Sequence, residues 1–231
     1  MSDPMMYIVE VDLPADDRAA HLDDFLGWYS YVHAADLYEA GFTACASYRS
    51  IDGEKDVVDV YQAAGWEVFQ SRGFEAYRRA APTDPYYPTF MKSVIPVRTP
   101  YVDAPRRSGV SDASAAPLAR DWITIWRFAA DDGLLADVAE WLDTGGEQVA
   151  AAEGAAFVRL LQRTREAPTG GSNRPRGALL FAGATEPSLA LRTGELAPAF
   201  LKSSLAEGSR FTGFRLFPWP RDPALRARVD A

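Results

Sequence analysis

Apolar and polar residues alternate in the first segment of the chain, and the pattern then changes to a helical one. Between Met5 and Leu13 every second residue is apolar, whereas the intervening positions become acidic at Glu10 and Asp12. A period of two is typical of a β-strand. Apolar residues then recur at three- and four-residue spacing until Gly41, which predicts an amphipathic helix with a glycine stop.

The rest of the first hundred residues predicts three more strands and a second helix. The Asp-Gly pair at 52–53 is a turn signal between two of these strands. Pro96 suits a strand edge or a bulge, because proline cannot donate a hydrogen bond to a neighbouring strand. The resulting order β-α-β-β-α-β is that of a ferredoxin-like unit. Strands are predicted at 42–51, 56–63 and 91–97, and the helix at 66–80.

A segment without periodicity, rich in proline, serine and alanine, follows from residue 99 to residue 120 and is typical of a linker. After it the order repeats. Trp28 and Trp141 each stand thirteen residues before a helix-ending glycine, and Tyr61 then corresponds to Phe181, which indicates a tandem duplication. Strands are predicted at 121–129, 156–163, 178–184 and 211–217, and helices at 133–153 and 187–205.

We therefore predict an α+β fold of two tandem ferredoxin-like repeats. The first repeat is placed at residues 1–102, the linker at 103–120 and the second repeat at 121–231. One ferredoxin-like unit covers only one face of its sheet with helices, so two units can bury their remaining faces against each other in a barrel-like body. A pocket at that interface is the expected ligand site.

Charge and cysteine content narrow the classes of partner and compartment. The formal net charge is −8, and runs rich in lysine and arginine are absent, so nucleic acid and anionic membranes are poor partners. No secretory signal is recognisable, and no apolar stretch approaches the roughly 20 residues that span a bilayer. Cys45 is the single cysteine and cannot form a disulfide framework. We expect a cytoplasmic protein, a monomer or a homodimer, with a small-molecule substrate.

The end of the first predicted helix carries the motif WYxxxHxxDL-x3-GF at residues 28–42. This motif resembles the dimeric α/β-barrel superfamily, and within it the EthD-like proteins. The superfamily includes cofactor-free monooxygenases, polyketide cyclases, lactone isomerases, dehydratases, decarboxylases and haem proteins. In several branches a histidine at this place faces the cavity, and the resemblance assigns that role to His33. The sequence departs from the related pattern at Val32, where an acid often precedes the histidine, and at Ala35, where proline is usual.

Among the candidate catalytic residues, His33 is the sharpest, because imidazole exchanges a proton near neutral pH without a cofactor. The alternative is that it caps the helix end or packs structurally. Glu10 and Asp12 are expected on the cavity side of the first strand, where a carboxylate can orient His33 or act as the base; otherwise they lie at a solvated strand end. Asp59 is a weaker candidate of the same kind.

Aromatic residues and one arginine are the candidates for substrate binding. Tyr29, Tyr48, Tyr61 and Trp66 can line a pocket for a flat apolar ligand, or else belong to the ordinary core. Arg159 interrupts the apolar run FVRLL; it can clamp a carboxylate or an enolate, or pair with an acid across the sheet.

No cofactor is predicted. Clustered histidine and cysteine ligands for a metal are absent, as are the glycine-rich loops that hold nucleotides. Some tandem-barrel relatives bind haem through a histidine in their second half, but no histidine follows His33.

The predicted function is a cofactor-independent acid/base enzyme of the cyclase, dehydratase, isomerase or decarboxylase type. Its substrate would be a small apolar molecule, aromatic or polyketide-like, in specialised or degradative metabolism. The alternatives are a noncatalytic ligand-binding or assembly protein and a cofactor-free monooxygenase.

Overall fold

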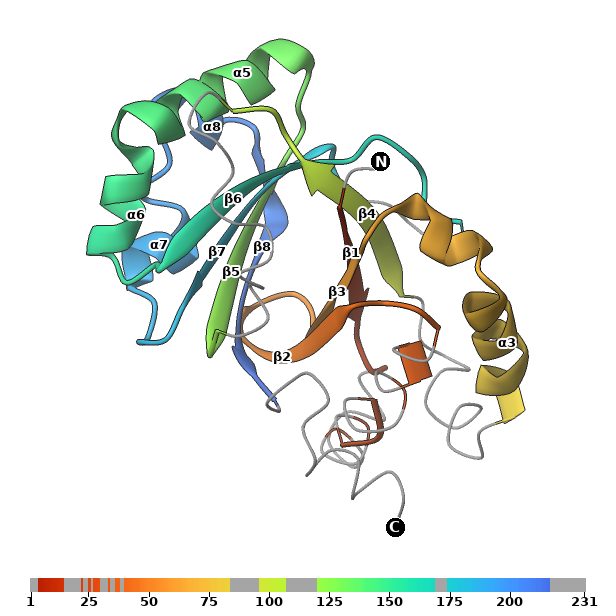
Figure 1. The fold of residues 1–231 in the computed structure, drawn as a ribbon. Coiled ribbons are helices and arrows are strands. Elements are labelled where there is room, and N and C mark those ends of the chain that lie inside the picture. Colours follow the sequence, from red (N-terminus) through yellow and green to blue (C-terminus); the bar gives the residue numbers. More distant parts are fainter. Residues whose placement is uncertain are drawn as a thin grey trace.

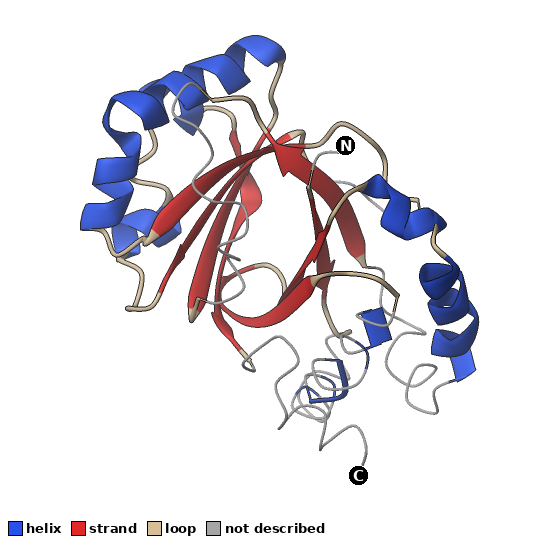
Figure 2. Cartoon of the chain, in the orientation of Figure 1, coloured by secondary structure: helices blue, strands red, loops and turns tan. Residues whose placement is uncertain are grey.

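The computed structural model contains an eight-stranded closed antiparallel barrel with helices on its outside (Figures 1 and 2). The structure describes residues 4–14, 22, 25, 27–29, 33, 36–37, 40–83, 96–106, 120–168 and 174–216, with the backbone alone at 206–209. The strands are β1 (Met5–Val11), β2 (Ala44–Gly53), β3 (Val57–Ala63), β4 (Val97–Asp103), β5 (Trp122–Phe128), β6 (Phe157–Gln162), β7 (Gly177–Gly183) and β8 (Leu205–Arg215).

The barrel consists of two four-stranded halves of the same topology, so the predicted fold of two ferredoxin-like units is confirmed. The strand order around the barrel is β1-β3-β2-β8-β5-β7-β6-β4. The halves are joined by a β2–β8 ladder and by a short β4–β6 ladder. Origin of the two halves by duplication stays a prediction.

The helices cover the outer face of the strands. Residues 22, 25, 27–29, 33 and 36–37 are helical, in agreement with the predicted first helix. The other helices are η2 (Trp66–Gln70), α3 (Arg72–Ala80), η3 (Ala81–Thr83), α5 (Asp132–Trp141), the π-helix η5 (Leu142–Gly146), α6 (Glu147–Ala152), α7 (Leu189–Thr193) and α8 (Ala199–Lys202). Gly41 (φ 102°) and Gly154 (φ 97°) adopt the left-handed conformation that favours glycine at a helix end, as their positions predicted.

Three predicted helices are interrupted by local breaks. Ser71 ends η2 and starts α3, where its hydroxyl accepts a hydrogen bond of 3.0 Å from the Phe74 backbone N–H. The helix predicted at 133–153 contains the π-helical turn η5. The one predicted at 187–205 is divided into α7 and α8, because Pro198 is the N-cap of a new helix.

The prediction for β4 was wrong in position. Thr99–Asp103 belongs to this strand and not to a linker, whereas residues 91–95 and 107–119 lie outside the described residues. Pro100 obscured the strand pattern. It is tolerated because β4 pairs with β6 only through Val102 and Asp103, so most of its length has β1 as its sole neighbour. β8 also begins six residues before the predicted start at 211.

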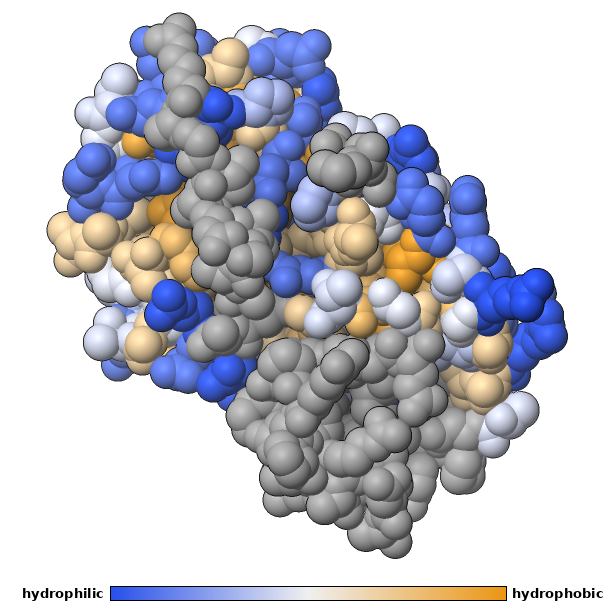
Figure 3. Space-filling view, viewed as in Figure 1, coloured by the Kyte–Doolittle hydropathy of each residue, from blue (hydrophilic) through white to orange (hydrophobic). Residues whose placement is uncertain are grey.

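Every residue of β1 is buried, because one face of the strand lies in the barrel interior and the other lies under helices. The same holds for β5. Hydrophilic residues therefore gather over the outer sides of the helices in Figure 3. No helix in the described ranges is long and apolar enough to cross a membrane.

The hydrogen-bond registers relate positions in the two halves. β1 pairs with β3 from Met5–Ala63 to Val11–Val57, and β5 pairs with β7 over an equally long ladder, from Trp122–Gly183 to Phe128–Gly177. Superposing the two ladders makes Val9 equivalent to Trp126, and Glu10 equivalent to Arg127.

Candidate functional site

A cavity of about 190 Å³ lies in the first half, between the outer face of the sheet and the helices. Its volume is below the roughly 300–1,000 Å³ of pockets for drug-sized ligands, so it suits a compact molecule. It is not the predicted pocket at the interface of the two halves. Its described lining comprises Tyr7, Val9, Tyr29, His33, Leu37, Tyr61, Phe74, Tyr77, Arg78, Ala81, Pro82, Pro96 and Arg98.

His33 is held by aromatic neighbours on the wall of this cavity. Its Nε2 lies 3.2 Å from the hydroxyl oxygen of Tyr77 on α3. Its ring stacks against those of Trp28 and Tyr29, with centroid distances of 5.2 and 5.1 Å. The side chain is buried (6% exposed). The imidazole therefore has a fixed orientation and one nitrogen within hydrogen-bond distance of a hydroxyl that can carry a proton.

A buried carboxyl lies beneath the cavity floor. Tyr61 donates a hydrogen bond of 2.6 Å to Oδ2 of Asp59, while Oδ1 has no hydrogen-bond partner among the described residues. Burial raises the pKa of Asp59 to about 7, although the neighbouring hydroxyls of Ser47, Tyr61 and Tyr29 oppose the rise. Burial, followed by the negative charge of Asp59, raises the pKa values of Tyr29 and Tyr61. These tyrosines therefore stay protonated donors.

Arg98 supplies positive charge to the opposite side of the cavity. It forms no hydrogen bond or ion pair within the described ranges, and its charge favours the ionised form of Tyr29. In the ladder register, Asp59 of β3 and Arg98 of β4 flank Val9 of β1. The site therefore has a weak acid on one side of Val9 and a guanidinium on the other, a separation of about 10 Å across three strands.

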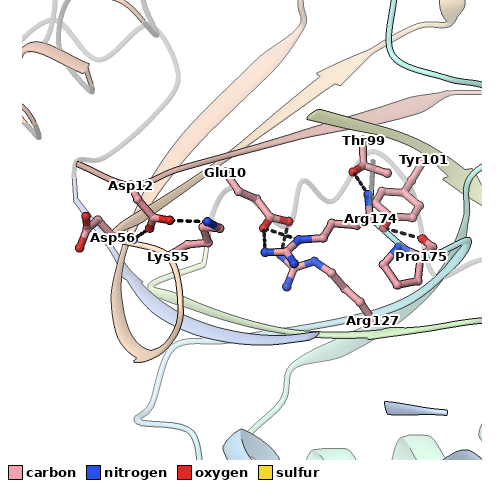
Figure 4. A network of polar contacts seen from close by, with 9 residues as sticks. All are labelled: Glu10, Asp12, Lys55, Asp56, Thr99, Tyr101, Arg127, Arg174 and Pro175. Atoms are coloured by element: carbon pink, nitrogen blue, oxygen red, sulfur yellow. Dashed lines mark hydrogen bonds and ion pairs between the residues drawn. The ribbon is translucent and has the colours of Figure 1, made fainter. Parts of the chain in front are cut away.

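Glu10 lies on the opposite face of β1 and points into the barrel interior (Figure 4). It is 1% exposed, and its Oε1 lies 2.5 Å from Nη2 of Arg127. Its Oε2 accepts a hydrogen bond of 2.9 Å from Nε of Arg174. The prediction that Glu10 orients His33 was wrong. Successive residues of a strand point to opposite faces, and the cavity adjoins the face of β1 that carries the Val9 side chain.

Asp12 is also part of the scaffold and not of the cavity lining. Its Oδ1 accepts a hydrogen bond of 2.9 Å from the backbone N–H of Asp56, and its Oδ2 pairs with Lys55. Asp12 therefore fixes the loop before β3, and the proposed carboxylate partner for His33 was wrong here too.

Three of the five predicted substrate-binding residues lie away from the cavity. The Tyr48 hydroxyl donates a hydrogen bond of 3.4 Å to the carbonyl of Arg120. Trp66 packs on Phe69, at 5.0 Å between ring centroids. Arg159 forms a two-pronged ion pair with Asp103, at 2.8 and 2.6 Å, so the alternative of pairing across the sheet is confirmed. Tyr29 and Tyr61 do line the cavity.

Sequence reasoning missed Tyr7, Tyr77 and Arg98. Tyr7 stood on the strand face that was taken to be plain core. Tyr77 follows Phe74 by three residues on one face of α3, a spacing that could have indicated a second wall. Arg98 lay beside Pro96 at an uncertain strand boundary. No group of three or more histidine, cysteine, aspartate or glutamate residues in the described ranges could hold a metal ion.

The second half fills the equivalent space with an indole. Trp126 of β5 pairs with Leu179 of β7 and Arg210 of β8, just as Val9 of β1 pairs with Asp59 of β3 and Arg98 of β4. Trp126 is fully buried, and its Nε1 donates a hydrogen bond of 2.8 Å to the carbonyl of Leu191. The cavity of the first half is therefore made possible by a small residue at position 9.

The position of His33 also differs between the halves. His33 lies five residues after Trp28, and the residue five positions after Trp141 is Gly146. Gly146 is therefore the equivalent of His33 in the second half. A Cβ at Gly146 would lie 2.7 Å from the Trp141 ring, so the second half has no room for a side chain there. An imidazole is thus a feature of the first half and not a requirement of the fold.

The second half does not fit a haem held by histidine. No histidine follows His33 in the sequence. In addition, the rings of Trp126 and Phe181 pack at a centroid distance of 4.5 Å on the outer face of β5 and β7.

The fold matches solved structures of the dimeric α/β-barrel type. An anthrone oxidase-like protein has a TM-score of 0.56 and 10% identity over 94% of this chain and 92% of its own. A variant of the chlorite dismutase from Candidatus Nitrospira defluvii has a TM-score of 0.55 and 10% identity over 99% of this chain and 96% of its own. A candidate monooxygenase from Fusobacterium nucleatum has a TM-score of 0.51 and 10% identity over 94% of both chains. Such low identities show a shared fold alone.

No protein-family profile and no curated protein matches the chain in sequence. The likeness to the EthD-like group therefore stays a prediction.

Proposed function

We propose that this protein is a cofactor-independent enzyme that transfers protons on a small, flat, mostly apolar molecule bound in the cavity of the first half. The observation that carries the proposal is His33, whose Nε2 lies 3.2 Å from the Tyr77 hydroxyl at the wall of a cavity lined by aromatic rings. A base of this kind removes a proton from a carbon beside a carbonyl group. Cyclisation, dehydration, isomerisation and decarboxylation all begin or end with such a transfer.

The remaining polar groups suit the charge that forms after proton removal. An enolate oxygen carries negative charge, which hydroxyl donors and a guanidinium stabilise in a site shielded from water. Besides the Tyr77 hydroxyl at the imidazole, the described lining contains the hydroxyls of Tyr7, Tyr29 and Tyr61 and the guanidinium groups of Arg78 and Arg98. His33 acts as the base, the Tyr29 hydroxyl binds the developing oxyanion, and the guanidinium groups supply positive charge to the cavity.

An oxidative reaction is the second candidate, because the structural neighbours include an anthrone oxidase-like protein and a candidate monooxygenase. It would begin with the same proton transfer: an enolate formed in the cavity reacts with molecular oxygen. For anthrone, one oxygen molecule is consumed, and anthraquinone and one water are formed. Proton removal by His33 is thus common to both candidates.

The test measures proton exchange on fused-ring ketones. Anthrone and 2-tetralone are incubated in deuterated buffer under nitrogen, and deuterium uptake at the acidic carbon is followed by mass spectrometry. The wild-type protein should accelerate uptake. His33→Asn should lower the catalysed rate at least 100-fold, in the range for loss of a general base, while binding of the ketones is retained. Tyr77→Phe should have a smaller effect, because it removes only the partner of the imidazole.

The outcomes separate the candidate functions. Equal exchange rates for wild-type and His33→Asn protein, both with ketone bound, would show that the imidazole is no base. Binding without any acceleration would favour the noncatalytic ligand-binding alternative. If anthrone disappears only in air, with one anthraquinone formed per oxygen consumed, the reaction is oxidative.

A further inference from the structure

The cavity wall is rich in hydrogen-bond donors and poor in acceptors. Its described lining contains three tyrosine hydroxyls on β1, β3 and α3, a fourth on the first helix, and two arginines, but no aspartate or glutamate. The nearest carboxyl to this wall in the ladder register, Asp59, lies behind Tyr61. Its pKa of about 7 leaves it about half protonated at pH 7 and largely protonated below that pH. The wall is therefore suited to a ligand that brings its own negative charge.

Arg98 is the residue best placed to receive that charge. Eight other arginines of the described chain form ion pairs: Arg79, Arg106, Arg127, Arg159, Arg163, Arg174, Arg176 and Arg215. Arg98 is half-buried beside apolar side chains and has no acidic partner among the described residues. A guanidinium without a counter-charge at an apolar cavity binds planar oxyanions well, because its donors match two oxygens at once.

The second half provides an internal comparison. Arg210 occupies the position equivalent to Arg98, since the two arginines pair with Trp126 and Val9 respectively. Arg210 donates a hydrogen bond to the carbonyl of Thr193 at the end of α7. An arginine at this position can therefore serve as a helix cap. Arg98 has no such bond within the described ranges and lines the cavity instead.

We propose that the ligand of this cavity is an aromatic carboxylate, whose carboxylate group binds Arg98 and whose rings lie among Tyr7, Phe74 and Tyr77. The inference rests on the proposed function, in that it assigns the substrate class of the same cavity. The ring carbon that reacts would then face His33, while the carboxylate anchors the molecule at the other side of Val9.

The test is a binding experiment that needs no turnover. Affinities of the full-length protein for 2-naphthoate and 2-naphthol, which differ in their acidic group, are measured by calorimetry at pH 7. The wild-type protein should bind the carboxylate at least 10-fold more tightly. Arg98→Gln should weaken naphthoate binding about 10- to 100-fold, the range for a charge-assisted hydrogen bond, and leave naphthol binding unchanged. Arg210→Gln is the matched control and should keep the wild-type preference.

Three results would overturn the inference: equal affinities for the two probes in the wild-type protein, a preference that persists in Arg98→Gln, or no binding of either probe. Failure here is distinguishable from failure of the proposed function. Proton exchange on neutral ketones that depends on His33 would still support the enzyme, with a neutral substrate.

Discussion

Asp59 carries a carboxyl whose ionisation the fold opposes. Asp59 is fully buried, and its carboxyl accepts a hydrogen bond from the Tyr61 hydroxyl. The pKa of this carboxyl rises from 3.8 to about 7 on folding because burial removes water from the charged form. Between these pH values the folded protein keeps a proton that the unfolded chain has released.

The pH dependence of stability follows from this difference. The stability due to Asp59 is fully present below about pH 4 and is lost as the pH rises to 7, by on the order of 4 kcal/mol. Asp59→Asn should remove this loss. Urea unfolding of both proteins at pH 4, 5.5 and 7 measures it, with the exposed Asp52→Asn as the control. If wild-type and Asp59→Asn stabilities change in parallel over this range, the carboxyl is ionised in the folded state.

At the scale of single elements, β1 shows what sequence reasoning could and could not reach. The alternation from Met5 to Leu13 correctly indicated a strand, and the glycine stops at Gly41 and Gly154 correctly indicated helix ends. However, both faces of β1 are buried. Polarity correctly placed Glu10 on the face toward the second half, but it could not tell that the cavity adjoins the opposite face, which carries Val9.

The helix and the third strand were more informative than the first strand. His33, Tyr29 and Tyr61 were identified as candidates, and all three line the cavity. Arg98 could not be found, since its role depends on the β1–β4 register and on the absence of a described acidic partner. Such information arises only when strands distant in sequence pair with each other.

The comparison of β1 with β5 predicts the effect of filling the cavity. Val9→Trp introduces the residue that the second half accepts at position 126. We expect loss of 2-naphthoate binding of at least 10-fold, with little loss of stability because the new ring occupies empty space. The reverse exchange, Trp126→Val, empties a packed core and should cost about 3–5 kcal/mol. Calorimetry and urea unfolding measure the two effects; undiminished binding by a folded Val9→Trp protein would show that ligands bind elsewhere.

At the scale of the whole molecule, the two halves meet through buried charge. Glu10 of β1 contacts Arg127 of β5, and Arg174 from the segment before β7 lies against the same carboxylate (Figure 4). The backbone N–H of Arg174 also donates to Thr99 of β4, and Tyr101 donates to the carbonyl of Pro175. These contacts tie the second half to β1 and β4 through the barrel interior.

Removal of the central charge should weaken the whole barrel. Glu10→Gln leaves two arginines without their buried counter-charge, and we expect a loss of about 3 kcal/mol in the free energy of unfolding. Glu75→Gln breaks the exposed pair with Arg79 and should cost no more than about 0.5 kcal/mol. Urea unfolding at pH 7 compares the two variants. Equal small losses would mean that the interior is solvated enough to tolerate the two arginines without this carboxylate.

The Glu10–Arg127 pair also decides which halves can associate. The two residues occupy equivalent strand positions, so a barrel of two first halves would bring two copies of Glu10 together without Arg127, and a barrel of two second halves would bring two copies of Arg127 together without Glu10. Repulsion between like charges in a buried site disfavours both assemblies. Self-recognition of each half is thereby suppressed, whether its partner belongs to the same chain or to an exchanged copy. In any dimer that exchanges halves between two molecules, each barrel would therefore still combine one first half with one second half.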